Sequence, residues 1–321
     1  MLSLQAWVVK FFCRLFVKRA LMKPSKAPID GIRRMRRRLS RYDLFNASFK
    51  RGLRVERVMG PVRGEWLLPR GAPRDRAVLY VHGGAFVACS PLTHRRLTTA
   101  LAKESGVPVF AVKYRLAPEA RFPAALDDAV AAYDALRARG IAAERIVIAG
   151  DSAGGGLALA AVLALLQRPQ PERLGGALAF SPWTDLLGTG DSIRTNAASD
   201  DMLPGTGIIE SAANYAPTDA IRRDPLASPL YGDLRDFPRA LVFASTTEVL
   251  RDDGVRFVER ARAAGATAEI VLQRGMPHVW PIFYDVMPEA RRTVRRASAF
   301  VREAVGGTAS GSSAARASSA R

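Results

Sequence analysis

Short apolar runs alternate with alanine- and leucine-rich stretches from about residue 55 onward. The runs are rich in β-branched residues and bounded by turn residues, as buried parallel strands are. They read AVLYVH, VPVFAVKY, RIVIAG, ALAFSP, RALVFAS and AEIVLQ. The stretch FPAALDDAVAAYDALRARG, with Pro123 near its start and Gly140 past its end, is typical of the helices between them. This order predicts an α/β fold with a mostly parallel, doubly wound sheet and helices on both faces.

The first 22 residues are mostly apolar, but Lys10, Arg14 and Lys18 recur every four residues and would form one stripe of a helix. A membrane-spanning helix needs about twenty apolar residues without such interruptions. A signal peptide carries its charges before the apolar run, so neither pattern is met. Either the helix lies on a membrane surface, or it folds back and caps the body with its apolar face. We favour the second interpretation and expect residues 1–45 to form basic amphipathic cap helices.

The rest of the chain is expected to form one α/β domain over residues 46–305. Within it, the turn-rich and polar stretch 183–224 interrupts the alternation of strands and helices. An insertion of this length is typical of a lid or functional loop. The last segment, 306–321, has the low-complexity sequence GGTASGSSAARASSAR. We therefore predict a disordered tail there.

The net charge of +18 is concentrated at the start of the chain. Residues 1–41 contain twelve Lys or Arg and a single acid, Asp30. Such an arm suits anionic lipid or an acidic partner. Nucleic acid is not expected, because no helix-turn-helix, zinc-finger or base-stacking signature accompanies the arginines. Peripheral membrane contact through this arm is left open, and so is a homodimer.

Only two cysteines occur, Cys13 and Cys89. Two cysteines cannot form a disulfide framework, and they lack the paired spacing of a zinc site. We therefore expect a cytoplasmic protein without a structural metal.

The strongest local signal is IVIAGDSAGGG, followed by the apolar stretch LALAAVLALL. A buried strand here runs into Gly150, Asp151, Ser152, Ala153 and Gly154, and a helix follows. This is the G-x-S-x-G nucleophile elbow in its proper strand-to-helix context. The two flanking glycines allow a turn tight enough to present the hydroxyl of the serine at the end of the strand. The alternative is a glycine-rich turn with a structural serine.

A serine hydroxyl is a weak nucleophile until a base accepts its proton, and that base is usually histidine. The chain has three histidines, His82, His94 and His278. In α/β hydrolases the order along the chain is Ser, acid, His. Only His278 satisfies this order after Ser152. His94, in the stretch PLTHRR, is interpreted as a surface helix residue.

The base must be oriented by a carboxylate. Glu248 is the carboxylate nearest the end of the strand-like run RALVFAS, where the acid should lie. Asp252 and Asp253 are interpreted as charges in the first turn of the next helix. Asp185 also follows a strand end and is the second candidate for the acid.

The stretch HGGA ends the run AVLYVH and predicts an oxyanion loop. Acyl transfer develops negative charge on an oxygen, which preorganised backbone N–H groups stabilise. We expect Gly83 and Gly84 to donate beside Ala153, while His82 shapes the loop. A purely structural turn is the alternative.

These motifs, in order, resemble those of the hormone-sensitive lipase family, the bacterial family IV esterases of the α/β-hydrolase superfamily. The resemblance covers about residues 76–301 through HGGAF, YRLAPEARFPAALDD, GDSAGG, SPWTDL, DPLASPL and MPHVW. It implies an α/β-hydrolase fold with an N-terminal helical cap. It assigns the nucleophile to Ser152, the base to His278, the acid to Glu248 and the oxyanion glycines to Gly83 and Gly84.

Two positions depart from the family pattern. The third glycine of the oxyanion loop is Ala85, which we expect to be tolerated because the two donating positions stay glycine. The acid is Glu248 rather than the commoner Asp, and either carboxylate can orient an imidazole. The chain should therefore be a cofactor-free serine esterase or lipase-like hydrolase acting on short- to medium-chain acyl esters through a catalytic triad. The alternatives are an acyltransferase with the same triad, or a noncatalytic ligand-binding protein on a hydrolase fold.

Overall fold

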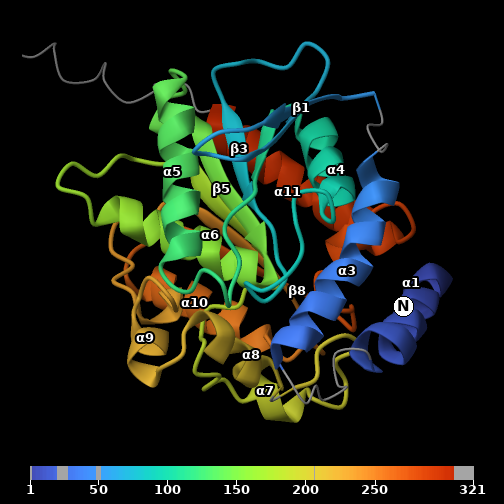
Figure 1. The fold of residues 1–321 in the computed structure, drawn as a ribbon. Helices are drawn as coiled ribbons and strands as arrows, with labels where there is room; N and C mark the ends of the chain where they lie inside the picture. Colours follow the sequence, from blue (N-terminus) through green and yellow to red (C-terminus); the bar gives the residue numbers. More distant parts are fainter. Residues whose placement is uncertain (1, 20–27, 48–51, 206, 307–321) are drawn as a thin grey trace, which may run out of the picture.

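The computed structural model of this chain describes residues 2–19, 28–47, 52–205 and 207–306. Its centre is an eight-stranded sheet of order β1-β2-β4-β3-β5-β6-β7-β8, with helices on both faces (Figure 1). The strands are β1 (Arg54–Val58), β2 (Gly64–Leu68), β3 (Ala77–Val81), β4 (Val109–Val112), β5 (Ile146–Asp151), β6 (Gly176–Phe180), β7 (Ala240–Ser245) and β8 (Ala268–Gln273). Strands β3 to β8 are the six predicted runs and pair in parallel. The predicted fold class is thus confirmed.

Two strands at one edge of the sheet were not among the predicted runs. β1 pairs antiparallel with β2, and β2 pairs antiparallel with β4. The sequence of β1 is RVERV, and its residues are exposed or only partly buried. A charged edge strand of this kind lacks the apolar run by which the buried strands were found.

The helices are α1 (Leu4–Phe12), α3 (Pro28–Ala47), α4 (Arg95–Ser105), α5 (Ala124–Ala138), α6 (Ser152–Leu166), α7 (Ser192–Thr195), α8 (Gly207–Tyr215), α9 (Asp219–Arg223), α10 (Arg251–Ala263) and α11 (Pro288–Gly306). A π-helical segment, η1 (Cys13–Lys18), continues α1. Short 3-10 turns are η2 (Ala143–Arg145), η3 (Pro229–Tyr231) and η4 (Trp280–Phe283). None of the described helices is long and apolar enough to cross a membrane.

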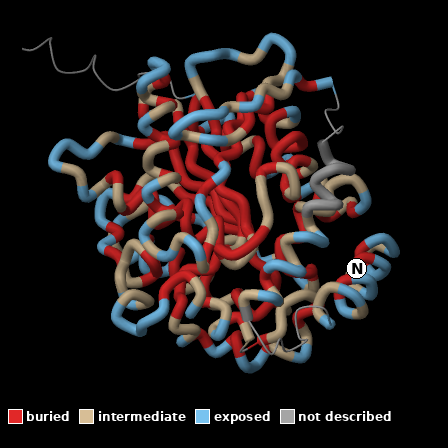
Figure 2. Tube along the Cα trace, in the orientation of Figure 1, coloured by how far each residue is buried: buried red, intermediate tan, exposed pale blue. Residues whose placement is uncertain are grey.

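The sheet separates two buried apolar clusters, because alternate residues of each strand point to opposite faces. On β3, Leu79 belongs to the cluster that includes α5, α6 and α10, whereas Tyr80 belongs to the one that includes α4 and α11. Both clusters appear as the red interior of Figure 2. A sheet covered on both faces holds the ends of its strands rigidly, and the candidate site lies at those ends.

The N-terminal helix packs against the body in a different orientation from the one we favoured. We expected its apolar face to cover the body, but Trp7 and Phe11 are exposed. The smaller Ala6 and Val9 are buried, and Lys10 points to the body and contacts it. The body presents carboxylate and carbonyl oxygens at this place, and these need cationic partners rather than apolar ones.

Parts of the predicted insertion and of the predicted cap are helical. Helices α7, α8 and α9 fall within the predicted insertion 183–224 and lie at the lower end of the molecule in Figure 1. The predicted cap, 1–45, contains α1, η1 and most of α3. Of the predicted tail, residues 307–321 lie outside the described residues.

Candidate active site

The predicted nucleophile lies in a strained turn between β5 and α6. Ser152 has a φ of 53°, which lies in the left-handed region that residues other than glycine rarely adopt. A Cβ atom on Gly154 would collide with the carbonyl oxygens of Val81 and His82. Glycine is therefore required there for the turn to pack against the end of β3, which agrees with the motif interpretation.

The structure brings the three predicted triad side chains together. The hydroxyl oxygen of Ser152 lies 2.9 Å from Nε2 of His278, and Nδ1 of that ring lies 2.6 Å from Oε2 of Glu248. His278 is only 3% exposed, and Glu248 is fully buried. The serine follows β5, the glutamate follows β7 and the histidine follows β8. Because these strands are parallel, all three residues lie at the carboxyl-terminal ends of the strands.

The second carboxylate oxygen of Glu248 is held by groups that the sequence analysis did not identify. Its Oε1 accepts hydrogen bonds from the backbone N–H of Ser245 at 2.6 Å and from the hydroxyl of Ser181 at 3.0 Å. The Ser181 hydroxyl also accepts from the N–H of Val279, next to His278. Ser181 thus links the acid to the loop of the base, and its place near the end of the predicted run ALAFSP was the available signal.

The electrostatics of the pair favour a charged imidazole. Burial by itself disfavours the imidazolium, but the hydrogen bond to Glu248 and its negative charge outweigh burial. The pKa of His278 is therefore raised above its ordinary value. A base with this pairing can hold a proton taken from Ser152.

The other candidate acids have structural partners instead. Both carboxylate oxygens of Asp185 accept hydrogen bonds, including those from the N–H of Thr189 and the hydroxyl of Tyr231. Asp252 and Asp253 lie in the first turn of α10, as expected. Burial and the neighbouring charge of Asp185 raise the pKa of Asp253 well above its ordinary value.

The HGGA stretch packs directly against the serine turn. A Cβ atom on Gly83 would lie 3.1 Å from Cβ of Ser152. The Gly83 N–H, however, donates to Oδ1 of Asp151 at 3.1 Å and is already engaged. Among the described residues, the N–H groups of Gly84, Ala85 and Ala153 have no hydrogen-bond acceptor. In this loop the N–H groups without an acceptor are thus those of Gly84 and Ala85, whereas we expected Gly83 and Gly84 to donate to the oxyanion.

A buried polar network lies behind the serine turn. Asp151 accepts hydrogen bonds from the hydroxyl of Tyr80 at 2.7 Å and from Nε2 of His94 at 3.1 Å. His82 stacks on Tyr114 and contacts the carbonyl oxygen of the residue that follows it at 2.8 Å. Burial, reinforced by the charge of His94, lowers the pKa of His82 to about 3, so that its ring is neutral.

The interpretation of His94 as a surface helix residue was wrong. The residue is 4% exposed and occupies the N-cap position of α4, where its side chain makes no capping hydrogen bond. Its neighbour Arg95 is also buried, where it pairs with Glu65 of β2. The arginines beside His94 suggested a solvent-exposed helix face. His94 and Arg95 are buried instead because each of them contacts a buried carboxylate, Asp151 and Glu65 respectively.

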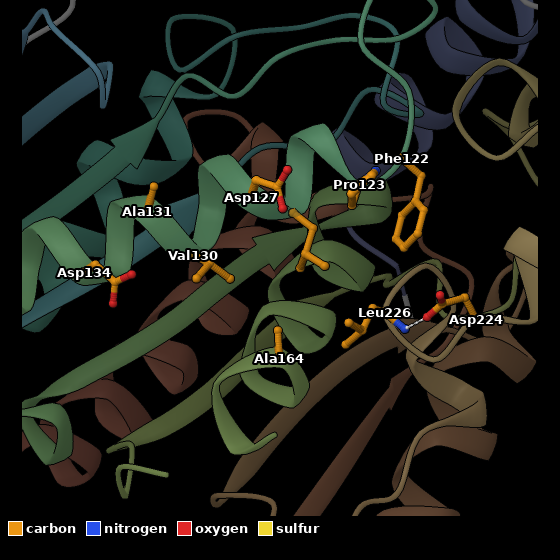
Figure 3. Close-up of a pocket in the computed structure, with 10 residues that line it drawn as sticks. Phe122, Pro123, Asp127, Val130, Ala131, Asp134, Ala164, Asp224 and Leu226 are labelled. Atoms are coloured by element: carbon orange, nitrogen blue, oxygen red, sulfur yellow. Dashed lines mark hydrogen bonds between the residues drawn. The ribbon is translucent and has the colours of Figure 1, made fainter. Parts of the chain in front are cut away.

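A surface hollow of about 560 Å³ lies elsewhere, along α5 and the far end of α6 (Figure 3). Phe122, Leu126, Val130 and Leu226 form part of its wall. None of the predicted site residues is among its lining residues. The hollow is therefore separate from the candidate active site.

Comparisons with known proteins identify the fold and the family of this chain. A family described as "alpha/beta hydrolase fold" matches residues 78–282. An acetyl-hydrolase of Streptomyces hygroscopicus is 41% identical over 251 residues, which are 78% of this chain and 82% of that protein. An esterase of Acinetobacter venetianus is 37% identical over 243 residues, covering 75% of this chain and 79% of that protein.

A crystal structure described as an esterase from the bacterial hormone-sensitive lipase family superposes with a TM-score of 0.84 at 36% identity. The match covers 95% of this chain and 99% of that one. The predicted family resemblance is confirmed. The chain belongs to the hormone-sensitive lipase family of α/β hydrolases and is an esterase-type hydrolytic enzyme.

Proposed function

We propose that this enzyme hydrolyses carboxylic esters with Ser152 as nucleophile, His278 as base and Glu248 as the carboxylate that orients the base. The continuous contact from the serine hydroxyl through both ring nitrogens to the carboxylate carries the proposal. A serine at 2.9 Å from an imidazole nitrogen is within reach of general-base proton transfer. The fixed carboxylate holds the tautomer in which Nε2 can accept that proton.

The reaction would proceed in two balanced halves. The hydroxyl oxygen of Ser152 attacks the ester carbonyl while its proton passes to Nε2 of His278. The imidazolium returns this proton to the departing alcohol, which leaves an acyl-serine. Water then attacks the acyl group by the same route, and its proton passes through His278 back to Ser152 as the carboxylic acid leaves. Glu248 stays ionised throughout and stabilises the imidazolium.

For the oxyanion we propose Gly84, Ala85 and Ala153 as the backbone donors. The loop packs against Ser152, and these amides have no acceptor among the described residues. Gly83 takes a different part from the predicted one, because its N–H holds the loop to Asp151. Loss of one such donor typically costs about 10²-fold to 10³-fold in rate.

The substrates we propose are esters with short to medium acyl chains. Two relatives are named for acetyl esters or ethyl acetate, namely the acetyl-hydrolase already described and an ethyl acetate hydrolase of Pseudomonas putida. Bulky side chains also crowd the oxyanion loop. The ring of Phe86 stacks on Tyr215 at 3.9 Å between centroids, and Trp183 lies 6.0 Å away.

The test is hydrolysis of a series of p-nitrophenyl esters, from acetate to long-chain esters, by the wild type and Ser152→Ala. We expect the variant to lose about 10⁶ in kcat, as when a nucleophile of this type is removed. Ser298→Ala is the matched control, because this buried hydroxyl has no partner among the described residues. Equal rates in wild type and Ser152→Ala would remove Ser152 from the mechanism.

A further inference from the structure

The N-terminal helix exposes a continuous row of large apolar side chains. We call this row the apolar stripe, and each of its members is between 45% and 77% exposed: Leu4, Trp7, Val8, Phe11, Phe12 and Phe16. The spacing of three and four residues places them on one side of α1 and its continuation η1. An exposed apolar patch of this kind marks an interaction surface, since water contact of so much apolar area is unfavourable.

Polar contacts on the opposite side fix the stripe in this outward position. The ammonium group of Lys10 lies 2.5 Å from Oδ2 of Asp201 and donates to the carbonyl oxygen of Gly275 at 2.8 Å. The ammonium group of Lys18 donates to the carbonyl oxygen of Asp200 at 2.6 Å. Rotating the helix to bury the stripe would break these charge-assisted contacts. The cations that should face a membrane in an ordinary interfacial helix are thus engaged by the protein.

The exposed charges around the stripe are almost all positive. Arg14 and Arg19 are exposed beside it, and Arg14 also contacts the carbonyl oxygen of Ala198 and the carboxylate of Asp201. The first 29 residues of the sequence contain no acid. Helix α3 lies on the same flank of the molecule in Figure 1. Among the side chains of α3 that the structure describes, four arginines are exposed against one exposed carboxylate, Asp30: Arg33, Arg34, Arg37 and Arg38.

We propose that the apolar stripe, together with the arginines of α3, binds the surface of a bilayer that contains anionic phospholipids. The apolar side chains would enter the boundary between headgroups and acyl chains, about 5–10 Å deep. The arginines would lie at the level of the phosphates, which attract basic segments. A second copy of this chain fits the stripe less well, because pairing two such faces brings their positive charges together.

Docking through the stripe would hold the catalytic loops beside the lipid. Gly275, the contact of Lys10, lies three residues before His278. The carboxylate of Asp200 accepts from the N–H of Val249, the residue after Glu248. Gly275 thus lies in the loop that carries His278, and the loop of Asp200 is hydrogen-bonded to the loop that carries Glu248. Membrane binding itself does not depend on the proposed function.

Trp7 offers a direct readout of this binding. It is 59% exposed, whereas the other three tryptophans of the chain, Trp66, Trp183 and Trp280, are buried. The full chain is titrated with vesicles of phosphatidylcholine with and without phosphatidylglycerol. We expect binding to the anionic vesicles, a blue shift of the emission and quenching by brominated acyl chains. Raised salt and omission of phosphatidylglycerol should each weaken the binding at least about tenfold, since each cation near the surface contributes about fivefold.

The decisive variant is Val8→Ser combined with Phe11→Ser, which changes two exposed side chains. Its affinity for anionic vesicles should fall at least about tenfold, because two buried apolar groups are lost from the lipid contact. Met59→Ser is the matched control, since Met59 is 79% exposed in the turn between β1 and β2. Unchanged thermal unfolding and ester hydrolysis in both variants show that each is folded.

Three results would overturn the proposal. One is the absence of vesicle binding by the wild type, and another is equal binding by wild type and the Val8→Ser/Phe11→Ser variant. The third is a wild-type dimer in light scattering that the double variant loses, without vesicle binding by either. That outcome would assign the stripe to contact between two copies.

Discussion

Two buried histidine–carboxylate pairs lie near the serine turn, and they differ in what the second ring nitrogen of the histidine contacts. In the first pair, His278 contacts Glu248 at 2.6 Å and places its other nitrogen 2.9 Å from the hydroxyl of Ser152. In the second pair, His94 contacts Asp151 at 3.1 Å, and its other nitrogen contacts Thr93 Oγ1 at 2.8 Å. The same two residue types thus form one pair that ends on the serine hydroxyl and another that ends within the scaffold.

The function of such a pair depends on what the second ring nitrogen contacts, that is, the nitrogen that does not face the carboxylate. The Asp151 pair holds backbone, since the same carboxylate accepts from the N–H of Gly83 and the hydroxyl of Tyr80. Burial alone would raise the pKa of the Asp151 carboxyl. The charge of His94 and the hydrogen bonds from His94 and Tyr80 outweigh burial, so that the pKa of Asp151 is lowered and the carboxylate form is favoured. We therefore expect the Glu248 pair to control proton transfer and the Asp151 pair to control the position of the oxyanion loop.

Among the substitutions in the two pairs, Glu248→Gln should cause the largest loss of kcat. The amide cannot stabilise the imidazolium or hold the required tautomer, and an equivalent replacement of a triad acid costs about 10⁴ in kcat. The measurement is kcat for p-nitrophenyl acetate with the folded variant. A loss below tenfold would mean that the two pairs do not differ in the way proposed.

Asp151→Asn should have an intermediate effect of up to about 10²-fold in kcat, because a displaced oxyanion donor is the loss expected. Tyr80 and His94 donate to different oxygens of Asp151, and Asn keeps only one of these two acceptors, because its amide nitrogen can only donate. Stability should therefore also fall by about 1–3 kcal/mol. Steady-state kinetics and chemical unfolding measure the two effects. A loss as large as that of Glu248→Gln would place Asp151 in the proton-transfer machinery.

The pH dependence of kcat/KM distinguishes the two pairs by the position of its acidic limb rather than by the size of a rate loss. His278 must be neutral to accept a proton, so kcat/KM should fall as the pH decreases through its pKa, which the Glu248 pair raises above the ordinary value of about 6.5. Glu248→Gln removes the cause of the raised pKa, so this limb should move to lower pH. In Asp151→Asn it should stay nearly in place, since the charge of Asp151 is the last of the causes that act on His278. Equal movement in both variants would contradict the assignment.

Asp185→Asn should have the smallest effect on activity. Its carboxylate is hydrogen-bonded to neighbouring N–H and hydroxyl groups and lies 3.4 Å from Arg256, away from the imidazole contacts described above. We expect kcat close to the wild-type value, with a loss of about 1–3 kcal/mol in unfolding free energy because a buried hydrogen-bond acceptor is changed. A large loss of kcat at unchanged stability would restore Asp185 as a candidate acid.

The sequence predicted those parts whose signal is local. Six parallel strands were predicted from apolar runs. Ser152, His278 and Glu248 were proposed as a triad from residue type and order at strand ends, and their side chains are in contact. Strand β1 lacked such a run, and in β2 only the three apolar residues Trp66, Leu67 and Leu68 follow one another. The burial of His94 depends on Asp151, which is 57 residues away, so the arginines beside it misled the interpretation.

Two further features required the spatial arrangement. The engagement of the Gly83 N–H by Asp151 cannot be read from the HGGA motif, because it depends on how closely the loop approaches β5. Periodicity showed that α1 is amphipathic, but it could not show that the body offers oxygen atoms to Lys10 and Lys18. The pattern gives the faces of a helix, while the surface it meets decides which face turns inward.

The central claim is that the Glu248 pair, and no other, activates Ser152. A fluorophosphonate forms a stable bond to an activated serine, and peptide mapping by mass spectrometry locates the adduct. We predict a single adduct on Ser152 in the wild type, formed at nearly the same rate in Asp185→Asn and slower by orders of magnitude in Glu248→Gln. An adduct on a different serine, or wild-type labelling of Ser152 in Glu248→Gln, would contradict the account.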